Sequence, residues 1–376
     1  MAALKQGEKN YLEEHSKVKV AFYEKYLNLY LTVLLNTPYV KAINIYDVFC
    51  GVGIYDGDGS KGSPVVAMEC IKKQLKIHYK NKNKPISLLI NDGNKTRVNI
   101  ASEYIEKHYD NQFSFKAFNY EAEKIFKLVV DKIQKSKHNE SHFIFIDPHG
   151  YKNIYKNDIV NIMEAGKSEI LIFLPIHQMY RFSEATMTPN SNSSEANPLK
   201  RFIKEFQLNY VADSPKKYIE HVEQSFSFGG RYYTTNFRLK ATNNTYALFF
   251  ITKNLKGLEK SVETKWDLDE LCGKGFEKKD RISLFSDEED DMQKEDCFKE
   301  LSLKLNQYLQ TKRTNNEIYE FTLKNGFLIK HANAILKMLQ KDNKLIFFDD
   351  KRRKKTFYLG YKYYNNEAIY KVKINE

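Results

Sequence analysis

The alternation of apolar and polar positions predicts strands and helices in turn along most of the chain. Apolar side chains recur at helical spacing over 17–35, and 43–48 is the first short apolar, β-branched run. Further helices are predicted at 63–78, 96–108, 121–136 and 154–164, and further strands at 86–91, 113–118, 142–147 and 169–174. Strands that alternate with helices indicate βαβ units and hence a parallel sheet.

The pattern then predicts how this sheet is completed. The polar, turn-rich stretch 184–198 predicts a loop, and helical sequence resumes at 198–206 and 214–227. Residues 231–239 and 245–253 predict an antiparallel hairpin. Five parallel strands closed by an antiparallel pair match an α/β fold, the Rossmann-like class I methyltransferase sheet.

A different pattern begins after the acidic run 287–291. Helices are predicted at 296–310, 315–325 and 328–341, followed by strands at 345–348 and 356–359 around the basic tip 349–355. Three helices and a hairpin predict a winged helix-turn-helix. The expected organisation is an N-terminal helical segment 1–40, a Rossmann-like domain 41–270, an acidic linker 271–295 and a winged helix-turn-helix domain 296–376.

Three of the predicted strands end in carboxylates, at Asp47, Asp92 and Asp147. Since parallel strands end at the same edge of a sheet, this favours the S-adenosylmethionine (SAM) crevice of a methyltransferase over a dinucleotide site. The expected SAM-binding residues are Asp47, Phe49, Gly51, Gly53, Asp92 and Asn119. Asp92, or the neighbouring Asn91, would bind the ribose, and Asn119 would bind the adenine. The alternatives are a glycine turn that only closes a strand–helix corner and a solvated turn acid.

The candidate catalytic residues are Asp147, Pro148 and His149. In enzymes that methylate amino groups, the fourth strand ends in Asp/Asn-Pro-Pro-aromatic. The side-chain oxygen accepts the amino hydrogens, and the aromatic ring stacks on the flipped base. His149 departs from that pattern and Tyr151 comes one residue late, so a turn without chemistry stays the alternative. His177, after the fifth strand, is a further candidate for substrate contact.

Cysteine chemistry is not expected. Methylation at cytosine C5 needs a Pro-Cys after the fourth strand, which this chain lacks, so Cys50 is interpreted as a small buried side chain. The four cysteines show no Cys-x-x-Cys spacing, which argues against a metal site or a disulfide framework and fits a reducing, cytoplasmic location. Neither a signal peptide nor a membrane span is predicted.

The charge balance favours a polyanionic partner. The 376 residues carry a formal net charge of +12, although a general richness in Lys, Asn, Ile and Tyr weakens the inference from charge alone. Phosphate contacts are predicted on the third C-terminal helix and on the hairpin tip. The residues are Lys330, Asn333, Lys337, Lys351, Arg352, Arg353, Lys354 and Lys355.

Four motifs resemble those of the three-Cys-motif partner (TcmP) family. They are His15…Lys19 in a helix that continues to Tyr26-Leu27, the Asp-x-Phe-x-Gly-x-Gly of 47–53, Gly62-Ser63-Pro64, and Asp147-Pro148-His149-Gly150. The resemblance covers roughly residues 12–270, and Phe is usual in the family where His149 stands. It implies a methyltransferase-like Rossmann domain, often with a C-terminal winged helix, and a partner protein that carries the three cysteines.

The leading hypothesis is a SAM-dependent methyltransferase of nucleic acid, with DNA favoured over RNA, that acts on an exocyclic base nitrogen. A second hypothesis is a non-catalytic scaffold of the same fold that binds nucleic acid and a three-Cys-motif protein. A third is an enzyme that modifies a protein or a small molecule.

Overall fold

The computed structural model describes most of the chain. The described residues are 11–78, 84–148, 150–177, 179–180, 196–208, 214–241, 244–277, 286–348, 359–361 and 371–374. The chain forms two compact units. The first consists of Met1–Lys253 and Phe276–Lys278, and the second of Asn254–Gly275 and Lys279–Glu376.

A mixed sheet forms the centre of the first unit, with the strand order β3-β2-β1-β4-β5-β7-β6-β8. β1 to β5 are parallel, and β7 lies antiparallel between β5 and β6. The first seven strands therefore have the arrangement of class I methyltransferases, as predicted. The strands are β1 (Ala42–Asp47), β2 (Ile86–Asn91), β3 (Ser114–Phe118), β4 (Glu140–Ile146), β5 (Ser168–Leu174), β6 (Tyr233–Lys240), β7 (Thr245–Thr252) and β8 (Gly275–Glu277).

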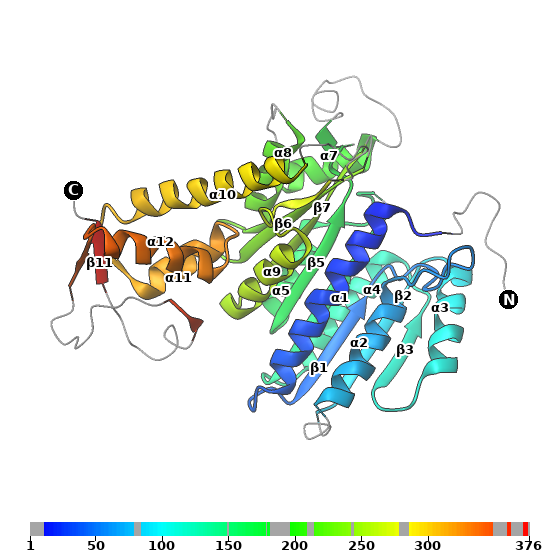
Figure 1. The fold of residues 1–376 in the computed structure, drawn as a ribbon. Coiled ribbons are helices and arrows are strands. Elements are labelled where there is room, and N and C mark those ends of the chain that lie inside the picture. The colour runs from blue at the N-terminus through cyan, green and yellow to red at the C-terminus, as the bar shows by residue number, and fades with distance from the viewer. Residues whose placement is uncertain are drawn as a thin grey trace. The chain divides into compact units, whose positions relative to one another are not determined.

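Helices cover both faces of this sheet (Figure 1). α1, α2 and α3 lie on one face, while α4, α5, α7 and α8 share a continuous apolar core with the other. Their bounds are α1 (Glu14–Leu35), α2 (Ser63–Ile77), α3 (Lys95–His108), α4 (Ala122–Lys135), α5 (Lys156–Ala165), α7 (Ala196–Glu205) and α8 (Pro215–Phe226). The helix–strand alternation predicted from residue 43 to residue 174 is confirmed.

Aromatic rings and one buried carboxyl group hold α1 on the sheet. The rings of Tyr23 and Phe145 are 4.6 Å apart between centroids. The Tyr26 hydroxyl donates a hydrogen bond of 2.5 Å to Glu169 on β5, which also accepts one of 3.1 Å from Thr252. Burial raises the pKa of Glu169 to about 7. The helix that precedes the sheet in sequence is therefore an integral part of the first unit.

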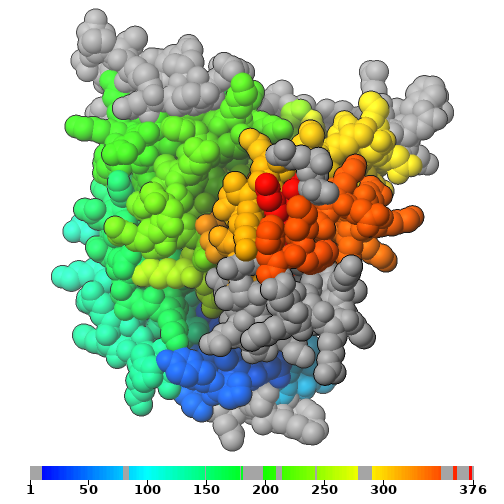
Figure 2. Space-filling view, turned by 90° about the vertical axis from the view of Figure 1, so that its left-hand side faces the viewer, coloured from blue at the N-terminus to red at the C-terminus, as the bar shows by residue number. Residues whose placement is uncertain are grey.

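The second unit combines four helices with a small antiparallel sheet of order β10-β11-β9. In it, β11 and α12 lie side by side (Figure 1 and Figure 2). A capping box at Thr314 and Glu317 begins α11. The elements are α9 (Leu255–Leu268), α10 (Ser286–Tyr308), β9 (Arg313–Thr314), α11 (Asn315–Lys324), α12 (Ile329–Lys341), β10 (Leu345–Phe347) and β11 (Lys371–Ile374).

The second unit differs from the sequence-based expectations in several places. α10 begins at Ser286, inside the segment 271–295 that was predicted to be an acidic linker. Within the described residues, β10 pairs with β11, whereas a partner at 356–359 was predicted; of that segment the structure describes only Leu359. The spacing of the cysteines argued against a disulfide framework, but Cys272 and Cys297 are bonded, with their Cα atoms 5.9 Å apart. Spacing along the chain could not reveal this pair, because folding brings together residues 25 positions apart.

Candidate functional site

The carboxylates predicted at the strand ends come together at one edge of the sheet. Asp47 ends β1, Asp92 follows β2 and Asp147 follows β4, and β1 is the central strand of the three. Burial is the main cause of the raised pKa of Asp47, and the charges of Asp147 and Asp92 raise this pKa further. The sheet therefore places the three acids near one another, as the strand-end pattern predicted.

Asp47 is the most unusual of these three groups. Its side chain is 0% exposed, and neither carboxylate oxygen makes a hydrogen bond of ordinary geometry with the described part of the chain. Burial is the main reason why its pKa rises to about 7, while the Ser63 hydroxyl at the start of α2 lowers it. Since buried polar groups are almost always satisfied, this carboxyl group is suited to meet a donor that comes from a ligand.

The two glycines of the turn after β1 have different roles. Both have positive φ, +62° at Gly51 and +73° at Gly53. A Cβ built on Gly51 would meet no atom within 4 Å, so the backbone there is open to a ligand. A Cβ on Gly53 would lie 3.0 Å from the Cβ of Ala101 in α3 and 3.3 Å from Cγ of Pro64. Gly53 therefore allows close packing of two helices, and its predicted contact with SAM stays a prediction.

Asp92 fastens the glycine turn to the end of β2. Its carboxylate accepts hydrogen bonds from the backbone N–H groups of Gly51, at 3.1 Å, and Asn94, at 2.8 Å. Asn94 in turn caps α3. Asn119 donates from its side-chain amide to the carbonyl oxygens of Asp92 and Gly93, at 2.8 and 3.0 Å. The predicted ribose and adenine residues thus lie side by side and are already held in place by the protein.

Asn91, the alternative to Asp92, has a structural role. Its side chain donates to the carbonyl oxygens of Val48 and Tyr120, both at 3.1 Å, and accepts from the Tyr120 N–H at 2.9 Å. Its own carbonyl oxygen accepts from the N–H of Cys50 at 2.8 Å. One buried amide therefore ties the segments after β1 and β3 to the end of β2.

The hydrophobic residues of the turn face the core. Phe49 is half-buried and packs edge to face with Phe126 of α4, at 6.2 Å between ring centroids. Cys50 is buried, and burial holds the pKa of its thiol well above the ordinary value. Phe49 therefore supports the turn by packing against the core. Cys50 lacks the environment that activates a thiol as a nucleophile.

Asp147 forms an ion pair with Lys19 of α1. Lys19 is itself 8% exposed, and its ammonium lies 4.6 Å from the centre of the Phe173 ring. The helix before the sheet thus brings a cation into the cluster of carboxylates. From the sequence, Lys19 was noted only as part of a motif. His15 and Lys19 are four residues apart and therefore lie on one face of the helix, and this spacing could have indicated that both side chains face the site.

The segment after Asp147 forms a turn. Pro148 is buried, and its carbonyl oxygen accepts from the Gly150 N–H at 3.0 Å. His149 lies outside the described residues. The ring of Tyr151 is buried in the core, and its hydroxyl donates to the carbonyl oxygen of Pro175. Tyr151 is therefore held within the protein, away from a stacking role.

Stacked rings line the next part of the same edge. The rings of His15 and Tyr246 are 4.3 Å apart and nearly parallel, and the ring of Phe173 lies 5.3 Å from Tyr246 and 6.5 Å from His15. Beside His15 and Tyr246, a hollow of about 400 Å³ lies between residues 11–17 and the β6–β7 turn. His177, predicted for the same edge, is half-buried just after β5. Sequence reasoning assigned no role to Tyr246, because an aromatic residue in a strand is usually core.

The predicted nucleic-acid contacts are only partly described. Lys330 and Lys337 are exposed on α12. Asn333 exchanges two hydrogen bonds with the backbone of Leu359, at 2.9 and 3.3 Å, so its amide serves the fold. The other predicted contacts, Lys351, Arg352, Arg353, Lys354 and Lys355, lie outside the described residues.

The described residues form neither a metal-binding cluster nor a membrane-spanning helix. Within the described residues, no group of three or more His, Cys, Asp or Glu side chains is placed to hold a metal ion. No helix in the described ranges is long and apolar enough to cross a membrane.

Comparison with known proteins shows likeness at the level of fold. No protein-family model and no curated protein matches the chain, so membership of the TcmP family stays a prediction. Among solved structures, the chain is similar to the O-methyltransferase TomG from Streptomyces achromogenes in complex with SAM. The identity is 8%, the TM-score 0.36, and the match covers 64% of this chain and 91% of that one. It is also similar to an O-methyltransferase from Bacillus cereus in complex with SAH, at 14% identity and a TM-score of 0.35, over 66% and 93% of the two chains.

This is a methyltransferase-like fold. At these TM-scores the similarity says nothing about substrate or site residues. The fold is assigned from the strand order with its antiparallel β7.

Proposed function

We propose that this protein is a SAM-dependent methyltransferase that acts on an exocyclic base nitrogen of nucleic acid. The observation that carries the proposal is the buried carboxyl group of Asp47, which makes no hydrogen bond of ordinary geometry with the described residues. It lies beside the open backbone of Gly51, at the carboxyl edge of a methyltransferase-like sheet. Both features fit SAM, which carries cationic and hydrogen-bond-donating groups. When bound, SAM supplies a methyl group from its sulfonium and leaves as S-adenosylhomocysteine.

The residues around Asp147 would bind the methyl acceptor. One carboxylate oxygen of Asp147 pairs with Lys19, and the other makes no hydrogen bond or ion pair with the described residues. That second oxygen would accept a hydrogen bond from the amino group and take the proton that the nitrogen loses as the N–C bond forms. Lys19 would fix the carboxylate in position through the ion pair. The rings of His15 and Tyr246 would offer a flat surface beside the acceptor.

The second unit supports nucleic acid as the substrate class. The order β9, α11, α12, β10, β11, with β11 between the other two strands, is one that a winged helix-turn-helix would have. Lys330 and Lys337 are exposed on α12, which would be the recognition helix of such a domain. Steep salt dependence of duplex binding would accompany phosphate contacts of this kind.

Titration of SAM and S-adenosylhomocysteine by calorimetry tests the cofactor. Gly51→Leu is the blocking variant. Gly59→Leu is the matched control, because Gly59 also has positive φ, +68°, and open space around it. Micromolar binding that is lost in G51L and kept in G59L supports the proposal. A folded protein that binds neither compound contradicts it.

The second candidate is a scaffold that binds nucleic acid and a three-Cys-motif protein without turnover. The pairing of Asp147 with Lys19 and the buried ring of Tyr151 favour it, because both depart from the pattern of amino-methylating enzymes. This candidate predicts salt-dependent duplex binding by a protein without affinity for SAM.

A further inference from the structure

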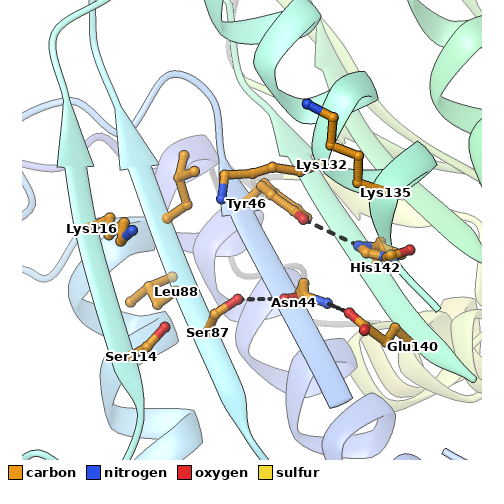
Figure 3. A pocket seen from close by; sticks show the side chains of 12 residues that line it. Asn44, Tyr46, Ser87, Leu88, Ser114, Lys116, Lys132, Lys135, Glu140 and His142 are labelled. Atoms are coloured by element: carbon orange, nitrogen blue, oxygen red, sulfur yellow. Dashed lines mark hydrogen bonds between the residues drawn. The ribbon is translucent and has the colours of Figure 1, made fainter. Parts of the chain in front are cut away.

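A second pocket lies at the opposite edge of the sheet from the strand-end acids. It has a volume of about 470 Å³ and opens on the face that α4 covers in part (Figure 3). Ser114, Ser87 and Asn44, near the amino ends of β3, β2 and β1, contribute to its lining. The methyl-transfer site does not use any of these residues, and the volume falls within the range of small-molecule sites.

The floor of this pocket is polar, although it belongs to a parallel sheet. Ser114, Ser87, Asn44 and His142 are in register on four neighbouring strands. The Ser87 hydroxyl donates to Asn44 at 2.6 Å, and Asn44 donates to Glu140 at 3.3 Å (Figure 3). Parallel sheets are normally apolar on both faces. In this row His142 is buried, Asn44 and Ser87 are half-buried, and Ser114 is exposed. These four polar side chains take no part in the site at the carboxyl edge of the sheet. Their alignment therefore indicates a separate function for this pocket.

Positive charge surrounds this floor. Lys116, Lys132 and Lys135 line the pocket and are exposed, and no ion pair or hydrogen bond of their ammonium groups occurs within the described residues. Glu140 is the only acidic side chain among the lining residues, and the Asn44 amide and the Lys137 N–H already engage its carboxylate. Burial lowers the pKa of His142 to about 4, so its ring is neutral near pH 7. The lining thus combines three cations with one anion.

We propose that this pocket binds a small phosphate ester. The ammonium groups of Lys116, Lys132 and Lys135 bind the phosphate as point charges, and the Ser114 hydroxyl is available as a further donor. The hydrogen-bonding floor holds the polar body of the ester. This assignment is independent of methyl transfer, because it uses neither Asp47 nor Asp147.

Calorimetric titration with ribose 5-phosphate and, separately, inorganic phosphate tests the assignment. We expect one saturable site per chain that is unaffected by excess S-adenosylhomocysteine. Lys116→Ala with Lys135→Ala should weaken binding at least about tenfold, since charge-assisted contacts are lost. Lys107→Ala with Lys127→Ala is the matched control, because both lysines are exposed on the same unit outside the pocket, and it should bind like the wild type.

The outcomes separate the sources of the signal. Tighter binding of ribose 5-phosphate than of inorganic phosphate identifies an ester site, and equal binding identifies a site for the free anion, which overturns the ester. Absence of saturation, or equal weakening in the K107A/K127A control, overturns the pocket as a site. Competition by S-adenosylhomocysteine assigns the binding to the other edge and also overturns it. A short oligonucleotide that binds in a K116A/K135A-sensitive manner, when ribose 5-phosphate does not, overturns the small ligand in favour of nucleic acid.

Discussion

Replacement of Asp47 by Asn should change how the stability of the protein depends on pH. The pKa of this carboxyl group is about 7 in the folded protein against an ordinary value of 3.8, mainly because of burial. Between these values the unfolded chain loses the proton while the folded protein keeps it, so stability falls as pH rises. Above pH 7 the accumulated loss is about 4 kcal/mol, at about 1.4 kcal/mol per pKa unit. Asn at this position removes that loss.

The readout is a difference between two variants, so that other titrating groups cancel. Urea unfolding followed by circular dichroism at pH 5 and pH 8 gives the free energy of unfolding of wild type and D47N. We expect D47N to gain about 3 kcal/mol relative to wild type between the two pH values. Any fixed cost of burying an amide shifts both values equally and leaves this difference unchanged.

Val48→Ala is the matched control, because Val48 is the next residue along the chain, is fully buried and carries no proton. Its effect on stability should be the same at both pH values. If D47N changed the free energy of unfolding by the same amount at pH 5 and pH 8, the reasoning would be refuted. Asp47 would then ionise in the folded protein as easily as in water. Such a result would mean that Ser63 or Lys19 solvates the carboxylate well enough to offset burial.

Three further predictions concern other parts of the structure. Gly53→Ala should cost roughly 1–2 kcal/mol more than Gly51→Ala in urea unfolding, because both strain a positive φ but only Gly53 faces Ala101 and Pro64; equal costs would contradict this. Lys19→Met and Asp147→Asn should be non-additive by about 1–2 kcal/mol in a double-mutant cycle, since the pair is largely but not fully buried, and simple additivity would argue against the ion pair. Cys272→Ala should destabilise the second unit by about 3 kcal/mol under oxidising conditions and by much less with a reductant, because the disulfide closes a 25-residue separation; thiol counting with and without reductant checks the bond itself.

Local patterns predicted the order of elements in the first unit well. The apolar runs that end at Asp47, Asn91 and Ile146 became buried parallel strands, because their length and β-branched composition suit no other element. The acids that follow meet at one edge for the same reason, since parallel strands share the direction in which they end. The periodicity of the chain and the geometry of a parallel sheet therefore both place the three acids at the carboxyl edge.

Contacts between distant residues could not be predicted in this way. Nothing in the run around Gly53 indicates that Ala101 will face it, because that contact depends on how α3 packs against α2. The pairing of Lys19 with Asp147 and the bond between Cys272 and Cys297 likewise depend on the tertiary fold. The strand partner of β10 was missed because the segment between β10 and β11 is longer than the short hairpin that the basic run predicted.

The docking of α1 determines when the proposed methyl-transfer site can be completed during synthesis. Lys19 and Asp147 are 128 residues apart, and Tyr26 and Glu169 are 143 apart. At typical rates of about 5–20 residues per second, the ribosome needs roughly 6–26 s to make the chain between Lys19 and Asp147. Throughout that interval the apolar face of α1 has no β4 or β5 to cover it. A nascent chain of this protein is therefore expected to expose an apolar helix face. Chaperones that bind such surfaces should associate with the chain until β5 has left the exit tunnel.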